Sequence, residues 1–187
     1  MTSAATQADH AIDAEPIGRA TRPRLLILGD NESEVVAAAG GLIYDRSSGG
    51  WDVVVHLTAS GDGRPLRILG AMSTSLADLG SFGDGSLWPD AVIVSPDVYR
   101  ENIGVRDYFT RALLRSQATA AMYGDDWPVG LGKDIGRVAY QLGPAARAFK
   151  RQAMLAAGVT PTLLAAAETL RGCRDFAAYR FVAAASG

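Results

Sequence analysis

Carboxylate side chains gather in one short segment, where Asp30, Glu32 and Glu34 occupy alternate positions directly after an apolar run. A fourth carboxylate, Asp97, follows a later apolar run. Carboxylate oxygens are the ligands that magnesium and calcium prefer, so Asp30, Glu32 and Asp97 could form an oxygen-ligand site. Acidic residues are also typical of the first turn of a helix, where the helix dipole favours negative charge. We favour this second interpretation and expect no bound metal and no cofactor.

The acidic segment lies inside a predicted β-α-β unit. The continuous apolar run Leu25–Leu28 is typical of a strand buried on both faces of a parallel sheet. A helix with one apolar face follows and ends near Ser48–Gly50, and Trp51–Thr58 is predicted as the second strand. Further apolar runs predict strands at Ala91–Val94 and Ala118–Tyr123. Strands that alternate with helices predict a doubly wound, mostly parallel α/β sheet with helices on both faces.

The remaining apolar residues recur mainly at helical spacing. They predict helices over Leu66–Leu79 and Val105–Ser116, and a longer helical region over Asp134–Ala157. The longer region should break near Gly143–Pro144, because proline cannot continue a helix interior. Proline is well tolerated at the first position of a helix, so Thr160–Pro161 is expected to begin another one.

The chain is expected to form one domain. Its first 23 residues, Met1–Pro23, are polar and lack hydrophobic periodicity, which predicts a disordered tail before a single α/β domain over residues 24–187. Within that domain, Asp175–Ala184 is compatible with a helix or an edge strand.

Composition narrows the classes of partner. The net charge of −2 gives no electrostatic reason to expect nucleic acid. No apolar run approaches the roughly 20 residues of a membrane span, and the N-terminus lacks the pattern of a secretory signal. A single cysteine, Cys173, cannot form an internal disulfide. We therefore expect a cytoplasmic protein that binds neither nucleic acid nor membrane.

Ligands bind to doubly wound sheets beyond the carboxyl ends of the strands. Three loops should converge there, namely Gly29–Glu34, Thr58–Arg64 and Ser95–Glu101, and they carry more acidic than basic residues. This charge disfavours phosphates and anionic sugars and favours a small neutral or cationic ligand, or a basic segment of a protein partner. The alternative is a filled crevice whose polar groups cap helices and pair with arginines. The candidate pocket residues are Asp30, Asn31, Ser33, Glu34, Thr58, Ser60, Asp62, Asp97 and Glu101.

Seven segments follow one another in a characteristic order along most of the chain. They are D-N-E-S-E-V-V-A-A-A-G-G at Asp30–Gly41, L-T-A-S-G-D-G at Leu57–Gly63, P-D-A-V-I-V-S-P-D at Pro89–Asp97, A-A-M-Y-G-D-D-W at Ala120–Trp127, K-D-I-G at Lys133–Gly136, F-K-R-Q-A-M at Phe149–Met154 and L-R-G-C-R-D-F-A-A-Y-R-F at Leu170–Phe181. This order resembles the LmbE/PIG-L family of zinc-dependent N-acetylglucosamine deacetylases. The resemblance implies the α/β fold of that family.

The residues that stand at the family's functional positions depart from its pattern. Aligning on Glu34 puts Asp30 at the first metal ligand, Glu32 at the general base and Ser33 at the second ligand. The family's later H-x-D-H segment falls on Arg100–Asp107, which contains no histidine. A catalytic zinc needs three protein ligands and an open position for water, so the resemblance implies a degenerate member without the metal site. Glu32 is the one remaining candidate for a catalytic base.

Histidine is too scarce to rebuild such a site elsewhere. Only two are present, His10 in the predicted tail and His56 inside the second predicted strand, where a lone histidine is more often a core residue than a ligand. We therefore expect a non-catalytic binding or assembly protein. One alternative is an active hydrolase or transferase of the LmbE/PIG-L-like type that uses the acidic cluster Asp30–Glu34 on a sugar-containing or small-molecule substrate. A nucleotide-binding module is another.

Overall fold

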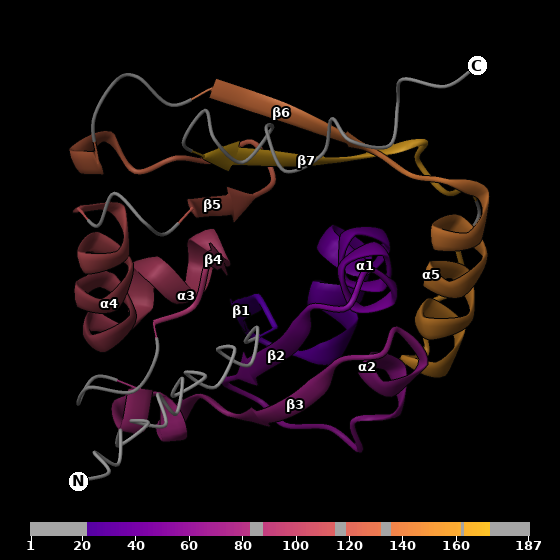
Figure 1. The fold of residues 1–187 in the computed structure, drawn as a ribbon, viewed down its shortest axis with the longest axis horizontal. Helices are drawn as coiled ribbons and strands as arrows, with labels where there is room; N and C mark the ends of the chain where they lie inside the picture. The colour runs from indigo at the N-terminus through magenta and orange to yellow at the C-terminus, as the bar shows by residue number, and fades with distance from the viewer. Residues whose placement is uncertain (1–21, 83–87, 115–118, 132–135, 162, 173–187) are drawn as a thin grey trace, which may run out of the picture.

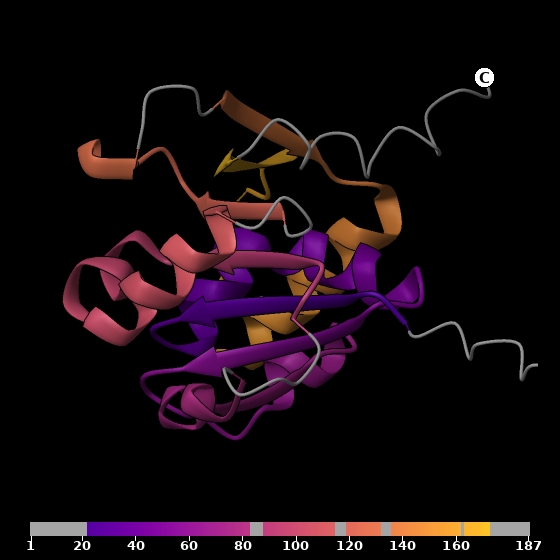
Figure 2. The same ribbon diagram turned by 60° about the vertical axis from the view of Figure 1, so that its left-hand side comes forward.

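The computed structural model describes residues 22–82, 88–114, 119–131, 136–161 and 163–172 (Figure 1). Seven strands within these residues form one sheet in the order β3-β2-β1-β4-β5-β7-β6. They are β1 (Arg24–Gly29), β2 (Asp52–Leu57), β3 (Met72–Ser75), β4 (Ala91–Val94), β5 (Thr119–Tyr123), β6 (Gly136–Gln141) and β7 (Ala167–Gly172). The first five strands pair in parallel, and β7 is antiparallel to both of its neighbours. Figure 2 shows the arrows of β1, β2 and β4 pointing toward one edge.

Helices cover both faces of the sheet (Figure 1). One face carries α1 (Glu32–Ser48), α2 (Arg64–Ile68) and α5 (Pro144–Ala156), whose apolar residues share a core with alternate residues of β1 and β2. The other face carries α3 (Pro96–Glu101), α4 (Ile103–Leu114) and the 3-10 helix η1 (Leu76–Phe82), which pack on the opposite residues of β1 and on β4. A second 3-10 helix, η2, spans Val129–Leu131. The predicted fold class, a doubly wound and mostly parallel α/β sheet, is confirmed.

The order in which strands are added to the sheet reverses between β1 and β4, which makes this position the topological switch point. From β1 the chain proceeds through β2 to β3 on one side, whereas β4 and β5 extend the sheet on the other. The register pairs Leu28 with Val94, so both strands end at the same level. Beyond these ends, Thr58 N–H donates to Gly29 O at 3.1 Å and Ser95 N–H donates to Leu28 O at 2.8 Å. A crevice at such a switch point is where doubly wound folds place ligands.

The first unit of the chain follows the sequence closely. The predicted strands, the long helix between them and the helix that begins near Val105 are all present, as β1, β2, β4, β5, α1 and α4. Leu25 to Leu28 are at most 3% exposed, as expected for a strand covered on both faces.

The prediction of one helix over Leu66–Leu79 is wrong. This segment forms α2, the edge strand β3 and the start of η1. Gly70 ends α2 with a left-handed φ of 79°, a conformation that glycine adopts without steric cost. Residues Met72–Ser75 then pair with β2 in parallel. Backbone pairing with an existing strand therefore outweighs the helical spacing of the leucines.

The predicted helical region Asp134–Ala157 is helical only in its second half. Gly136–Gln141 forms β6, which pairs antiparallel with β7, and α5 begins at Pro144, where a break was predicted. The helix expected from Thr160–Pro161 is also wrong, because the described residues between α5 and β7 contain no helix. The two segments form β6 and β7 instead, which pair with each other, and β7 joins β6 to β5.

Three sequence predictions concern residues outside the described part of the chain. They are most of the predicted tail Met1–Pro23, the segment Asp175–Ala184 and the single cysteine Cys173. Among the described residues, no helix combines the length and the apolar character needed to cross a membrane.

Candidate binding crevice at the strand ends

The acidic segment after β1 starts α1 through a dense set of local hydrogen bonds. Asn31 is the N-cap, and its Oδ1 accepts from Glu34 N–H at 3.0 Å and from the Ser33 hydroxyl at 2.6 Å. Glu34 reaches back, so that its Oε2 accepts from Asp30 N–H at 2.9 Å. This exchange is a close variant of the capping box, in which two otherwise unpaired backbone donors are satisfied reciprocally. Asp30 Oδ2 accepts from the Asn31 amide at 2.9 Å.

Glu34 also joins β1 to β4 across the switch point. Its second oxygen, Oε1, accepts from the hydroxyl of Ser95 at 2.8 Å, and Ser95 is completely buried at the end of β4. Both oxygens of the Glu34 carboxylate therefore have donors from the chain itself. Charge-assisted hydrogen bonds of this kind are about twice as strong as neutral ones.

Tyr123, the last residue of β5, lies beside the end of β1. A Cβ on Gly29 would lie 3.2 Å from its hydroxyl, which shows how closely the backbone of β1 approaches. Burial raises the pKa of the Tyr123 phenol above its ordinary value, and the nearby Glu34 carboxylate raises it further. The hydroxyl is buried and makes no hydrogen bond within the described residues. Tyr123 is therefore a protonated phenol whose donor lies beside Glu34 and Ser95.

Glu32, the candidate catalytic base, is directed toward the loop after β2. Its Oε1 accepts from Gly63 N–H at 2.6 Å, and its side chain is buried. A Cβ on Gly61 would lie 2.6 Å from the Glu32 carboxyl group, so this loop passes directly over it. Ala59 N–H in turn donates to Asp30 O at 2.8 Å. The carboxylate thus holds the loop after β2 against the start of α1.

The other predicted pocket residues lie at the exposed rim. Asp62 accepts from Arg64 N–H at 2.8 Å, and Asp97 pairs with Arg100, which also pairs with Asp126 after β5. Arg100 therefore joins α3 to the segment after β5, and the prediction of a loop over Ser95–Glu101 is wrong because Pro96–Glu101 is helical. The side chains of Thr58, Ser60 and Glu101 are exposed.

The structure thus separates the predicted residues into two groups. One group is tied together at the start of α1 and consists of Asp30, Asn31, Ser33 and Glu34. The others lie on the loops around it. Sequence reasoning did not select Tyr123 as a site residue, although it ends a predicted strand that neighbours β4. Ser95 belonged to a predicted crevice loop, but its bond to Glu34 depends on the order of the strands.

A buried ion pair between α5 and β7 lies against the middle of α1. Lys150 on α5 donates to Glu168 on β7 at 2.6 Å, and the two side chains are 6% and 2% exposed. Glu168 also accepts from the backbone amides of Gly41 and Leu42, at 2.7 and 2.9 Å, while Lys150 Nζ donates to Ala37 O at 2.7 Å. The pair therefore fastens one turn of α1 to α5 and β7. No pattern in the sequence indicates this contact.

His56 is also enclosed by the sheet. It is completely buried on β2, and its Nδ1 lies 3.0 Å from Ser75 O. Burial lowers the pKa of the imidazole. This residue lies inside the fold, in register with Leu28 of β1.

The residues at the strand ends do not fit a zinc site. The positions that the family resemblance assigns to metal ligands hold Asp30, with its Asn31 bond, and Ser33, which donates to Asn31. Across the described ranges, no group of three or more His, Cys, Asp or Glu side chains is placed to hold a metal ion. Of the three residues whose spacing allowed an oxygen-ligand site, Glu32 accepts from Gly63 N–H and Asp97 pairs with Arg100.

No family model and no curated protein match the sequence, but solved structures match the fold. A deacetylase triple mutant from the teicoplanin biosynthetic pathway has a TM-score of 0.56 at 14% identity and covers 80% of this chain and 97% of its own. The deacetylase–teicoplanin complex has a TM-score of 0.55 at 12% identity with the same coverage. The A40926 pseudoaglycone deacetylase has a TM-score of 0.51 at 14% identity and covers 72% of this chain and 81% of its own. The chain therefore has the fold of these deacetylases, as its segment order predicted.

Proposed function

We propose that this chain is a non-catalytic binding or assembly protein that uses a deacetylase-like fold, with the switch-point crevice as its binding surface. The observation that carries the proposal is that the carboxylates at the start of α1 are occupied by hydrogen bonds within the chain. Both oxygens of Glu34 and Oε1 of Glu32 accept hydrogen bonds from the chain itself.

A hydrolytic site needs a carboxylate that can accept a proton from water and a group that activates that water. Glu32, the only candidate base, is buried and covered by Gly61 and Gly63. Ser33 supplies a hydroxyl where the family's pattern has a carboxylate ligand. These residues have the arrangement of structural caps, which supports a role in holding the loops in place.

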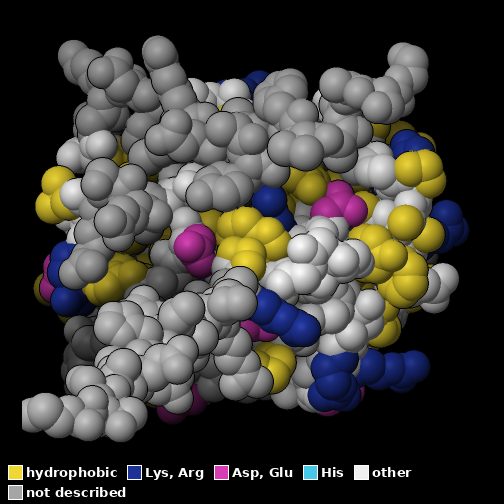
Figure 3. All heavy atoms as spheres, viewed as in Figure 1, with side chains coloured by type: hydrophobic (Ala, Val, Ile, Leu, Met, Phe, Trp, Pro, Cys, Tyr) yellow, Lys and Arg dark blue, Asp and Glu magenta, His cyan; other side chains and the backbone are white. Residues whose placement is uncertain are grey.

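The charge around the crevice points to the kind of ligand. Asp62, Asp97 and Glu101 lie exposed at the rim, and Arg100 is shared between Asp97 and Asp126. On the face shown in Figure 3, several basic side chains gather at the lower right, whereas the visible acidic side chains lie singly. An acidic rim of this kind favours a neutral or cationic small molecule, or a basic segment of a protein partner, over an anion.

The catalytic half of the proposal is tested by turnover. The purified protein is incubated with N-acetylglucosaminides and zinc, manganese or magnesium in turn, and the release of free amine is measured. We expect background rates, an unchanged rate for Glu32→Gln, and no stoichiometric zinc in elemental analysis after dialysis. Turnover that Glu32→Gln abolishes would show an active enzyme and overturn the proposal.

The binding half is tested by calorimetry with matched sugars. Glucosamine is cationic, N-acetylglucosamine is neutral and glucuronate is anionic, so the three probes separate charge from ring shape. We expect heat of binding from glucosamine and N-acetylglucosamine but not from glucuronate. The affinity for the two binding sugars should be weaker in Asp30→Asn and in Asp97→Asn. Asp107→Asn, which changes an exposed carboxylate on α4, is the matched control. A series of basic peptides tests the partner form, and binding that both crevice variants leave untouched would exclude the crevice as the working surface.

A further inference from the structure

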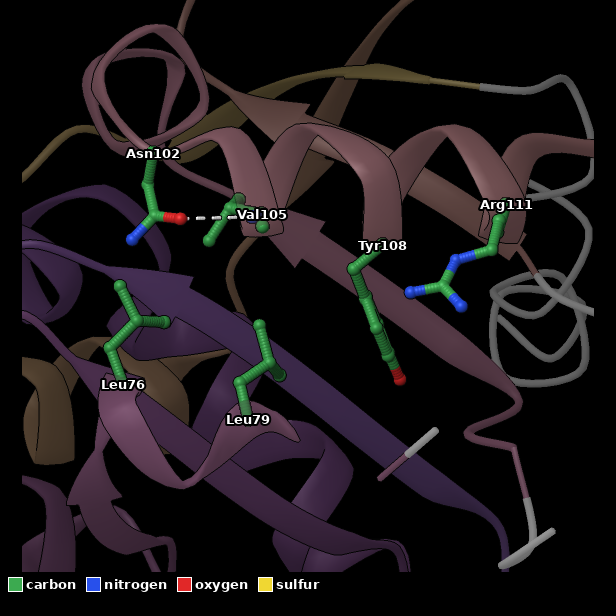
Figure 4. A pocket seen from close by; sticks show the side chains of 7 residues that line it. Leu76, Leu79, Asn102, Val105, Tyr108 and Arg111 are labelled. Carbon is green, nitrogen blue, oxygen red and sulfur yellow. Dashed lines mark hydrogen bonds between the residues drawn. The ribbon is translucent and has the colours of Figure 1, made fainter. Parts of the chain in front are cut away.

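A hollow lies between η1 and α4. Its volume is about 240 Å³, and it shares no lining residue with the three crevice loops. Figure 4 shows the lining side chains directed into the space between the two helices. The residues that line the hollow are Leu76, Leu79, Asn102, Gly104, Val105, Tyr108 and Arg111.

One part of the wall is apolar and well supported. Leu76 and Leu79 approach from η1 and Val105 from α4, and all three belong to the core on this side of the sheet. The Tyr108 ring stacks on Trp88 with 5.0 Å between centroids and 18° between planes. Aromatic stacking of this kind fixes the ring, so the wall has a defined shape without a ligand.

The other part of the wall carries a positive charge. In Figure 4 the Arg111 guanidinium and the Tyr108 hydroxyl point to the same end of the hollow. Arg111 donates from Nε to Asp107 O at 3.3 Å, and none of the ion pairs between described residues involves it. The nearest acid on η1, Asp78, accepts from the Thr74 hydroxyl at 2.8 Å. The guanidinium can therefore receive an external carboxylate.

We propose that this hollow binds a small amphiphilic anion, namely an aliphatic carboxylate of medium chain length. The carboxylate would pair with Arg111, and the alkyl chain would lie against the leucines of η1, Val105 and the Tyr108 ring. The volume of about 240 Å³ is below the roughly 300–1,000 Å³ of pockets for drug-sized ligands, which limits the chain to a short or medium length. The proposal does not depend on any role for the crevice.

Three probes with the same alkyl chain test the charge requirement. Octanoate, 1-octanol and octylamine are titrated into the full chain, and binding is followed by calorimetry and by amide chemical shifts in heteronuclear NMR. We expect octanoate to bind most tightly, octanol at least tenfold more weakly and octylamine not at all. The shifts caused by octanoate should concentrate on Leu76, Leu79 and Gly104. Equal binding of octanoate and octylamine, or shifts confined to the crevice loops, would overturn the proposal.

Substitution of Arg111 distinguishes carboxylate binding at this site from nonspecific binding of an alkyl chain. Arg111→Gln should weaken octanoate at least tenfold, because a hydrogen-bonded charge pair is lost, and should leave octanol unchanged. Arg111→Lys should retain part of the octanoate affinity. Arg147→Gln, at an exposed position of α5, is the matched control, and circular dichroism verifies that each variant is folded. Unchanged octanoate binding by Arg111→Gln would refute the assignment of the carboxylate to Arg111.

Discussion

The buried Lys150–Glu168 pair gives the most direct test of how the fold is held together. Replacing Lys150 by Met keeps most of the side-chain volume but removes the donor to Glu168 and to Ala37 O. Glu168, which is 4% exposed, would retain only the amides of Gly41 and Leu42 as donors. An unpaired buried charge is the costly outcome of such a change, whereas loss of the attraction alone costs much less.

The expected cost follows from the contacts. Removing one partner of a buried ion pair typically costs about 3–5 kcal/mol. Substitution of Lys150 also leaves Ala37 O without its ammonium donor. We therefore expect the free energy of unfolding of Lys150→Met to fall by about 3–5 kcal/mol. Glu168→Gln keeps one oxygen that can accept from Gly41 or Leu42. The double variant Lys150→Met/Glu168→Gln carries no buried charge and should be more stable than additivity predicts, by roughly 1–3 kcal/mol.

Urea denaturation measures these free energies. The exposed pair Arg137–Asp125, at 2.9 Å with side chains 63% and 66% exposed, supplies the control, and Arg137→Met should cost less than about 1 kcal/mol. A loss of less than about 1 kcal/mol in Lys150→Met, or additive behaviour of the double variant, would refute the reasoning. A variant that lacks a folded baseline even without urea counts as a loss at the upper end.

The pH dependence of Lys150→Met provides a second measurement on the same pair. Burial raises the pKa of Glu168, while Lys150 and the two amides oppose that rise. Without Lys150 the folded-state pKa rises further, so between the unfolded value and this raised value the native state binds more protons than the unfolded chain. Stability of the variant should therefore fall as pH rises through that window. The penalty relative to wild type should be largest at neutral pH and smaller under mildly acidic conditions.

Three further substitutions test separate parts of the structure. Ser95→Ala removes the donor to Glu34 Oε1 and should cost about 1.5–3 kcal/mol in urea denaturation; a cost below about 0.5 kcal/mol would contradict the bond's importance. Burial lowers the pKa of His56, so stability should fall as pH decreases below about 6.5, by at most about 1.4 kcal/mol per pH unit. Thermal unfolding of His56→Gln should lack that component. Gly41→Ala places a Cβ inside the Leu142 side chain and should cost about 1–3 kcal/mol despite the better helix propensity; Leu142→Ala in the same chain should recover part of the loss.

The elements that could be predicted are those whose signal is local. β1 is a continuous apolar run, and α1 has an N-cap, two acids in its first turn and an apolar face within one stretch of sequence. No other part of the chain is needed to specify either element. The sheet class follows from the same units, since their strands alternate with helices.

The elements that could not be predicted depend on distant partners. In β3, Met72 is 68% exposed, and the strand is defined by its pairing with β2. In β7, the buried positions alternate but include Glu168, a residue that a hydrophobic pattern assigns to the solvent face. Its burial depends on amides 126 and 127 residues earlier in the chain. β6 in turn exists only through pairing with β7, with Tyr140 as its one buried residue.

The crevice shows the same division between local and distant information. Capping by Asn31 and Glu34 follows from sequence spacing. The contact of Glu34 with Ser95 and its proximity to Tyr123 require β4 and β5 to lie beside β1, which is a property of the strand order. Sequence spacing therefore predicts that acidic residues lie at the start of α1, but not which residues of other strands bind them.

The engagement of these acids connects stability with the proposed lack of catalysis. To act as a base or a metal ligand, Glu34 would have to release the Asp30 amide and the Ser95 hydroxyl. Two hydrogen bonds to a charged group are worth roughly 3–6 kcal/mol together, a large share of the roughly 5–15 kcal/mol that stabilises a typical domain. Glu32 would similarly have to leave Gly63 and open the loop above it. Under the proposed non-catalytic role, substitution of these carboxylates should lower stability and leave turnover at background.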